Sequence, residues 1–425
     1  MKATDSQQTE VSKTSLEEAA ALLDDILGVQ ARTWGNTRKL PAAIRITEEL
    51  EPAGGFDIPF YPASYAGAVY DLNGVERDAK GNVIRARQCV VDSYQSQANR
   101  MEPAFKGKAL SPLVPQFLIS IPRKDEEDKL VNALDVSHRV ADFRVRLSEK
   151  KEMIGAIESW TKGDALPLVQ LMPTSIVFGF WDSRDTGTKH ARILMSRIDA
   201  FDVVPCQRNS IYTGEYSKDE MSQLLGEDLG PEKSAAEIDS DAGVDGGAEK
   251  KASKDKIDKV LSGAGFTSAL SSGGLGGVFA KTITRTSVIS LSALTQIHCK
   301  EPGEEKPSEA LTNAARRYLF CLAILAEAYQ RENHYLLRSG CELIPLGEAA
   351  FSVQGGEAIF QESLEKLAGN LPVVMQTALE AGGILNLSKG ETIQLTTDAI
   401  KKEFDRVSGK NTKNPKPASA KGGKK

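Results

Sequence analysis

A polar run at residues 92–102, DSYQSQANRME, carries side chains well suited to bind a sugar–phosphate chain. A helix over this run places Gln95 and Asn99 one turn apart, with Gln97 and Arg100 on the same short helix. Amide and guanidinium groups donate hydrogen bonds to phosphates, and an amide can also accept one from a 2′-hydroxyl. The run therefore predicts a contact with nucleic acid. A plain solvated helix face is the alternative that composition leaves open.

The segment 136–147 has apolar residues every three or four positions, which predicts an amphipathic helix. Such a helix puts His138 and Asp142 one turn apart, a spacing that could orient a metal ligand or a general base. No neighbouring acid or histidine supplies further ligands, so a structural hydrogen bond is the simpler interpretation. Arg139 and Arg146 lie seven residues apart, away from the apolar stripe, where they could meet a backbone phosphate.

The polar loop 182–192, DSRDTGTKHAR, carries Arg184, Lys189 and Arg192, and Arg197 follows in the next predicted strand. A basic loop at the end of a strand can hold phosphate groups. A solvated hairpin without a ligand is an equal alternative.

Two further segments, one aromatic and one rich in glycine, partly match known nucleotide-binding patterns. Residues 175–181, SIVFGFW, are apolar on both faces, which predicts a central strand with its aromatics in the core rather than stacked on bases. The glycine-rich stretch 263–277 matches neither the Walker nor the Rossmann fingerprint. As a loop beside Lys281 and Arg285, it could still bring backbone amides close to phosphates.

The net charge of −5 is unevenly distributed along the chain. Residues 217–249 hold ten acidic residues and two lysines, so the rest of the chain has a charge of −5 + 8 = +3. This stretch is also rich in Ser, Ala and Gly, and is predicted to be a solvated insertion rather than a packed element. Residues 410–425 contain six lysines and no acids. They are predicted to be a disordered, solubilising tail rather than an RNA contact.

Periodicity predicts both helices and strands. Helices are expected at 15–27, 92–104 and 308–329, the last with Leu311, Tyr318, Leu322 and Leu325 facing inward, and two or three more close the chain. Strands are expected at 42–50, 116–121, 192–203, 282–294 and 335–344, with turns at 73–74 and 80–82. The order lacks a regular βαβ period, so the fold class is α+β.

Composition excludes several classes of protein. The longest apolar stretch, near 319–328, is too short to span a bilayer, and residues 1–15 lack an apolar signal core. Five scattered cysteines and four histidines offer no local zinc spacing, which favours a reducing cytoplasm. No serine elbow or local nucleophile–base pair is present. We therefore expect a cytoplasmic protein that is not an enzyme, with no catalytic residues, no metal, no cofactor and no membrane partner.

The order of the motifs is more specific than any one of them. The segments 92–102, 138–142 and 177–184, followed by 192–203 and 284–291, resemble the RAMP-superfamily backbone (Cascade) subunit of type I-U CRISPR systems, also called I-G. The resemblance covers residues 40–345. It departs from the family pattern in the acidic insertion and the basic tail.

This resemblance implies a ferredoxin-like (RRM-like) palm with large insertions forming a thumb. The chain then divides into an N-terminal helical segment (1–40), a first palm and thumb part (41–216), the acidic low-complexity insertion (217–256), a second palm part (257–350), C-terminal helices (351–409) and the basic tail (410–425).

The resemblance also implies a function and a set of partners. Many copies would polymerise along one CRISPR guide RNA and present it for pairing with target DNA in antiviral defence. Other Cascade subunits and a helicase-nuclease would join them. The residues expected to bind RNA are Gln95, Gln97, Asn99, Arg100, Arg139, Arg146, Arg184, Lys189, Arg192, Arg197, Lys281 and Arg285.

Two alternatives stay open. The first is a metal-dependent RAMP endoribonuclease that acts on guide or target RNA, with Asp142, Asp182 and Asp185 as its candidate carboxylates. The second is an assembly protein that binds no nucleic acid.

Overall fold

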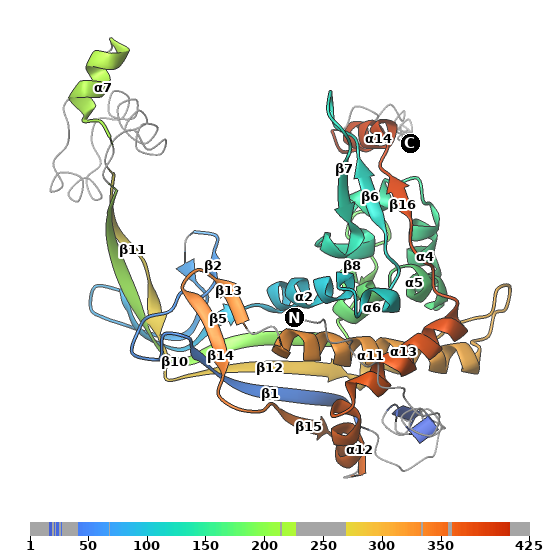
Figure 1. Ribbon diagram of the computed structural model, residues 1–425. Coiled ribbons are helices and arrows are strands. Elements are labelled where there is room, and N and C mark those ends of the chain that lie inside the picture. The colour runs from blue at the N-terminus through green and yellow to red at the C-terminus, as the bar shows by residue number, and fades with distance from the viewer. Residues whose placement is uncertain are drawn as a thin grey trace, which may run out of the picture.

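The computed structural model describes residues 17–18, 21, 23–24, 27, 41–67, 69–212, 215–226, 269–332, 335–355 and 359–408. This part of the chain mixes helices with a large antiparallel sheet, which confirms the α+β class. Figure 1 shows two protrusions that rise from the region of the sheet, a long hairpin arm and a lobe of short strands and helices.

The central sheet has the strand order β13-β14-β1-β12-β10-β5-β4. Its strands are β1 (Ala43–Pro52), β4 (Leu72–Arg77), β5 (Val83–Asp92), β10 (Leu194–Tyr212), β12 (Thr282–Ser290), β13 (Tyr335–Arg338) and β14 (Cys341–Pro345). A further strand, β15 (Ala350–Gln354), pairs with the start of β1, while β14 pairs with its end. Burial alternates along β1 and β12, so one face of each strand is directed into the core.

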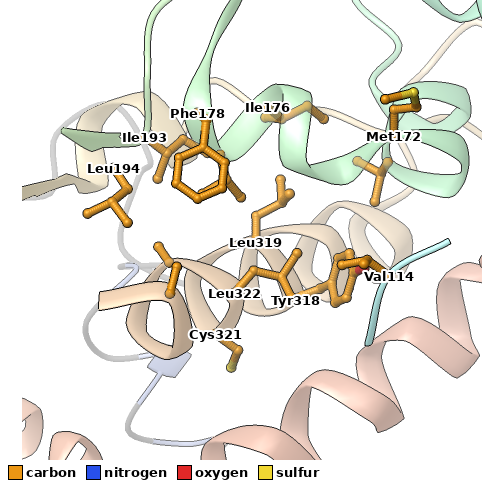
Figure 2. Close-up of a cluster of buried hydrophobic side chains, with 14 of the residues drawn as sticks. Val114, Met172, Ile176, Phe178, Ile193, Leu194, Tyr318, Leu319, Cys321 and Leu322 are labelled. Atoms are coloured by element: carbon orange, nitrogen blue, oxygen red, sulfur yellow. The ribbon is translucent and has the colours of Figure 1, made fainter. Parts of the chain in front are cut away.

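Two helices cover the face of the sheet that is directed into the core. They are α2 (Tyr94–Met101), which follows β5, and α11 (Glu309–Glu332), which follows β12 and the short α10 (Leu291–Leu294). The predicted inward positions Tyr318, Leu322 and Leu325 of α11 are buried, whereas Leu311 is half-buried. In Figure 2, Phe178 points toward α11 beside Leu319 and Leu322. These residues belong to the larger of two apolar cores.

The arm is a continuation of β10 beyond the sheet, paired with β11 (Ala269–Phe279). Helix α7 (Lys218–Leu225) lies at its end (Figure 1). A capping box between Ser217 and Glu220 begins this helix, so the start of the segment predicted to be a solvated insertion is helical. The rest of the insertion lies outside the described residues.

The glycine-rich stretch is a strand from residue 269 onward rather than the predicted loop. Its glycines have a packing role in the arm. A Cβ atom at Gly276 would lie 2.7 Å from the carbonyl carbon of Gln207 on β10, so only glycine permits this approach of the two strands. Residues 263–268 lie outside the described part.

The lobe contains a small sheet in the order β16-β6-β7 and a two-stranded sheet formed by β8 and β9. Its strands are β6 (Leu118–Ile121), β7 (Lys129–Asn132), β8 (Phe180–Trp181), β9 (Lys189–His190) and β16 (Thr392–Gln394). Its helices are α3 (Phe143–Arg146), α4 (Glu152–Thr161), α5 (Leu166–Leu171), α6 (Pro173–Phe178) and α14 (Thr397–Val407).

The remaining elements connect these parts. They are β2 (Ser64–Tyr65), β3 (Val69–Tyr70), α12 (Ile359–Ala368), α13 (Leu371–Leu385) and the 3-10 turns η1 (Glu102–Lys106), η2 (Ser111–Leu113), η3 (Ala133–Asp135) and η4 (Arg139–Ala141). Within the N-terminal segment, the described residues Glu17, Glu18, Ala21, Leu23, Asp24 and Leu27 are helical, as predicted.

Three local predictions are wrong. Residues 173–178 form the buried helix α6 instead of a central strand, because a short run that is apolar all round fits either element. The predicted helix at 136–147 is broken into η4 and α3, since Asp142 has extended backbone and caps α3 through the amide of Arg144. The Asn73–Gly74 pair lies inside β4, and the chain turns at the predicted 80–82 site instead.

Several predicted strands have different bounds in the structure. The strand expected at 192–203 continues to Tyr212, the one expected at 282–294 ends at Ser290, and the region 335–344 forms two strands. Both predicted palm parts contribute strands to the central sheet. The division of the chain into domains stays a prediction. No helix in the described part is long and apolar enough to cross a membrane.

Candidate nucleic-acid interface

Helix α2 exposes the polar face that the sequence predicts. Ser93 is its N-cap and accepts a hydrogen bond from the amide of Ser96, which fixes the first turn. Gln95 and Asn99 are exposed one turn apart, and Tyr94 is exposed beside them. These three side chains offer amide donors and acceptors next to an aromatic ring.

The opposite face of α2 is buried and hydrogen-bonded to the sheet. Gln97 is fully buried, donates to Asp92 at 2.7 Å and accepts from Ser196 at 3.2 Å. Arg100 pairs with the buried carboxylate of Asp92 at 3.1 Å and donates to the carbonyl of Leu337 at 2.7 Å. Gln97 therefore has a structural role, and Arg100 is largely engaged within the protein.

Arg285 lies beneath α2 rather than on the surface. Its guanidinium donates two hydrogen bonds of 2.6 Å to the carboxylate of Glu327 on α11, and Glu48 lies 3.7 Å away. The side chain is 1% exposed. Burial opposes the charge on Arg285, but the neighbouring Glu327 outweighs it, and the pKa of Arg285 is raised above its ordinary value. The prediction of Arg285 as a surface RNA contact is inconsistent with this burial.

Arg139 is also buried, and it joins α2 to the lobe. Its Nε donates to Glu102 at 2.8 Å, directly after α2, and its Nη1 donates to the carbonyl of Gly179 at 3.2 Å. Burial raises the pKa of Glu102, while the charge of Arg139 opposes that shift. Arg139 has a positive φ of 53°, a strained conformation for a side chain of this size. It positions β8 relative to α2 instead of facing solvent.

Arg192 is half-buried beside this junction. Its Nε is buried without a hydrogen-bond partner among the described residues. Burial, together with the charge of Arg139, lowers the pKa of Arg192 below its ordinary value. Gly179 allows this packing, since a Cβ there would lie 2.9 Å from Cγ of Arg192 and 3.0 Å from the carbonyl oxygen of His190.

The β8–β9 hairpin exposes a second group of polar and aromatic side chains. Trp181 is 56% exposed, and Nζ of the exposed Lys189, its cross-strand partner, lies 4.3 Å from the centre of the indole ring. Arg184 is exposed in the loop between the strands. Phe178 and Phe180 are buried as predicted, whereas Trp181 is not in the core.

Carboxylates hold the loop of this hairpin in place. Asp182 accepts hydrogen bonds from the amide and hydroxyl of Thr186 at 3.0 and 2.8 Å. Arg146 pairs with Asp182 at 3.2 Å and with Asp185 at 2.7 Å. Arg146 thus holds the loop in place. The single helix that was predicted to carry both Arg139 and Arg146 is absent, and Arg139 is buried in the separate turn η4.

The last two predicted RNA-binding residues lie on or beside β10 and β12. Arg197 pairs with Asp199, and its guanidinium lies 5.7 Å from the ring centre of Tyr94 on α2. Lys281 is exposed in the turn between β11 and β12.

The carboxylate at Asp142 is engaged by Arg144 rather than by His138. Its oxygens accept from Nε and Nη2 of Arg144 at 2.7 and 2.9 Å. Burial alone would raise the pKa of Asp142, but these hydrogen bonds hold it below its ordinary value. In the described part of the chain, no three His, Cys, Asp or Glu side chains lie together where they could hold a metal ion.

The structure therefore divides the predicted residues into two groups. Gln97, Arg139 and Arg285 are buried, and Arg100, Arg146, Arg192 and Arg197 are partly buried. The exposed group contains Gln95, Asn99, Arg184, Lys189 and Lys281. Sequence reasoning missed Tyr94 and Trp181. The position of Tyr94 at the start of the polar helix was an available signal, whereas the exposure of Trp181 follows from the helix that replaces the expected strand.

The exposed residues on α2 and on β8–β9 form one candidate interface. The chain of contacts from α2 through Glu102 and Arg139 to Gly179 fixes the two elements relative to each other. Figure 1 shows α2 and β8 at the base of the lobe, on the side that faces the arm. The arrangement offers amides, two cations and two aromatic rings, a set that can bind phosphates and stack on unpaired bases.

Comparison with known proteins gives a family match. Residues 44–205 match the family described as CRISPR-associated protein GSU0053. The matched region includes α2 and the β8–β9 hairpin, and it agrees with the family resemblance predicted from the motifs. No curated protein matches the sequence.

Proposed function

We propose that this chain is the guide-RNA-binding backbone subunit of a type I-U/I-G Cascade complex, and the match of residues 44–205 to the family of CRISPR-associated protein GSU0053 supports this proposal. In this role many copies line one guide RNA and leave its bases free to pair with target DNA in antiviral defence. Its other partners are the remaining Cascade subunits and a helicase-nuclease, and it acts in the cytoplasm.

The sheet supports a ferredoxin-like palm. Four neighbouring strands have the order β14-β1-β12-β10, and all three pairings are antiparallel. Helix α2 lies between β1 and β10 in the chain, and α11 lies between β12 and β14. A split βαβ unit of the ferredoxin-like type has this arrangement of strands and helices. The arm and the lobe are then insertions that supply the thumb.

The observations that carry the proposal are the exposed row on α2 and the Trp181–Lys189 platform on the β8–β9 hairpin, two elements that Arg139 connects through Glu102 and Gly179. These groups contact phosphates, hydroxyls and base faces, which every nucleotide offers, so the proposed binding does not depend on sequence. Such binding suits a guide whose own bases read the target.

We also propose that the subunit performs no chemistry. Two of the carboxylates that an RNase would need have structural partners: Asp142 is held by Arg144, and Asp182 by Thr186 and Arg146. A cleavage assay with magnesium, guide and target RNA tests this part. Cleavage that disappears in a folded Asp142→Asn or Asp182→Asn variant would establish the endoribonuclease instead.

The direct test of guide binding is recovery of RNA with the protein. The full chain is purified from cells that express a CRISPR array, and the bound RNA is sequenced. We expect guide RNA in the wild-type protein and at least a several-fold loss in a Gln95→Ala/Asn99→Ala/Trp181→Ala variant that remains folded. A protein that purifies without RNA supports the assembly-protein alternative.

A further inference from the structure

Three exposed aliphatic side chains lie together at the β13 edge of the central sheet. Leu336 on β13, Ile344 on β14 and Leu346 directly after β14 are 66%, 37% and 52% exposed. The alternate positions Cys341 and Leu343 are fully buried, so Leu336 and Ile344 point away from the core. We call these three residues the β13–β14 patch.

The strand register places carboxylates directly beside the patch. Leu336 is opposite Glu342 across β13 and β14, and Ile344 is opposite Glu51 across β14 and β1. Opposite side chains of an antiparallel pair share one face of the sheet and lie about 5 Å apart. The amide of Leu346 donates to the carbonyl of Glu49 at 2.9 Å, which keeps the third leucine next to β1 as well.

Four glutamates surround the patch. Glu49, Glu342 and Glu348 are exposed, and Glu51 is half-buried. None of the four forms an ion pair with another residue in the described part of the chain. Arg45 is an exposed cation on the same face of β1, four residues before Glu49. The rim of the patch is therefore acidic and its charge is uncompensated.

This combination selects the kind of partner. An apolar centre with a charged rim is typical of a surface that contacts another protein. The carboxylates repel phosphates, so the patch does not suit the guide RNA. Two copies of the patch cannot face each other either, because their like charges would repel. A protein surface with cations around its own apolar residues complements it.

We propose that the β13–β14 patch docks a segment of another protein in which aliphatic side chains are flanked by lysine or arginine. The guide is then bound on the side of α2, which covers the core-directed face of the sheet, and the partner is bound on the opposite face. The inference rests on the proposed function in one respect, since the partner is sought among the remaining Cascade subunits.

Cross-linking from the patch identifies what covers it. The full chain is expressed with a CRISPR array and the remaining Cascade subunits, with the photoreactive residue p-benzoylphenylalanine in place of Leu336. We expect cross-links to one other subunit, at a peptide with lysine or arginine close to the linked residue. The same photoreactive residue in place of Ile84, which is 50% exposed near the other edge of the sheet, is the control and should not label that peptide.

Cross-links from position 336 that reach only peptides of this chain would contradict the proposal. They would assign the patch to a second copy or to another segment of the same chain. The absence of any cross-link beyond those of the control would contradict it too, because a docked segment lies against the photoreactive group.

A charged double variant tests whether the patch is needed for binding. Leu336→Lys/Leu346→Lys removes two apolar contacts and repels a basic partner. We expect the purified complex to contain about tenfold less of the cross-linked subunit, because central apolar contacts carry most of the affinity of an interface. Val75→Lys/Ile84→Lys changes two other exposed aliphatic side chains on the same sheet and should leave the composition unchanged.

Thermal melts show whether the variants are folded, and Leu336→Ser/Leu346→Ser replaces the lysine variant if it is not. A folded variant that retains every subunit at the wild-type level would refute the docking surface.

The RNA content of the same samples separates this inference from the proposed function. The patch variant should retain as much guide RNA as the wild type, because the patch is not on the guide-binding side. A wild type that purifies without RNA, yet cross-links from position 336 to another subunit, refutes the proposed function and leaves the docking surface intact.

Discussion

The polar layer beneath α2 and the β8–β9 hairpin use the same residue types in opposite ways. Beneath α2, Arg285 is buried and shares two hydrogen bonds with Glu327, a partner on another element. On the hairpin, Arg184 is exposed in the loop, and Lys189 contacts an exposed tryptophan. The first region fixes the helix on the sheet, and the second presents charge to a ligand. A count of arginines in motifs cannot separate these roles, because the partner carboxylate decides them.

The largest expected effect comes from breaking the buried pair. Arg285→Met leaves Glu327 buried without its partner and should lower the free energy of unfolding by about 3–5 kcal/mol. Arg184→Met removes an exposed charge and should change it by less than about 0.5 kcal/mol. Urea unfolding of both variants measures the difference. Equal effects would mean that the two arginines are not in different environments.

We also expect the stability of the folded protein to depend on pH through His190 in the hairpin. Burial lowers the pKa of His190 from 6.5 to about 4, so the folded state holds its imidazole neutral. Stability is then complete above pH 6.5 and falls as the pH drops from 6.5 through 4, by up to about 3 kcal/mol. His190→Gln should remove this part of the pH profile, as measured by thermal melts between pH 7 and 4. An unchanged profile would show that other groups cause it.

The next smaller loss of stability is expected at Gly179, which lies between the two regions. Gly179 has φ of 78°, and a Cβ there would crowd Arg192 and the carbonyl of His190. Gly179→Ala should therefore cost about 2–3 kcal/mol of stability. Gly187 has a similar φ of 69° with open space around it, so Gly187→Ala should cost only about 1 kcal/mol. If the two variants unfold at the same denaturant concentration, the close contacts around Gly179 add nothing to the cost of the substitution.

The smallest effect on stability and a clear effect on binding are expected at Trp181. Trp181→Ala removes an exposed ring and should change stability by less than about 0.5 kcal/mol. If the indole stacks on a base, RNA affinity should fall by about 1–3 kcal/mol. Trp181→Phe should retain most of the affinity, since it keeps an aromatic face. An alanine variant with normal affinity would remove the hairpin from the interface.

The sequence predicts some of these features well and others not at all. The capped helix at α2 and the alternating strands β1 and β12 depend on local patterns, and the structure confirms them. Whether an arginine is buried or exposed depends on residues that are distant in the sequence. Glu327 lies 42 positions from Arg285, and Glu102 lies 37 positions from Arg139. No local pattern reveals such pairs.

The short apolar run before Trp181 shows a second limit. Periodicity does not distinguish a buried helix from a buried strand over six residues. The structure resolves the ambiguity in favour of α6, which begins at Pro173 and ends before Gly179. This change of element moves Trp181 from the expected core to the surface, and with it an aromatic group of the candidate interface.

RNA binding across a salt series tests whether the exposed cations of the β8–β9 hairpin contact the guide. Purified wild type, Arg184→Ala/Lys189→Ala and the matched control Lys162→Ala/Lys306→Ala, which removes two other exposed lysines, are titrated with unrelated single-stranded RNAs. For the wild type and the control we expect RNA affinity that falls steeply with salt concentration and does so equally for all RNA sequences. The slope of log affinity against log salt should fall by about 1.4 in the test variant, for two lost phosphate contacts. A flat wild-type response, or an unchanged slope in the test variant, would contradict it.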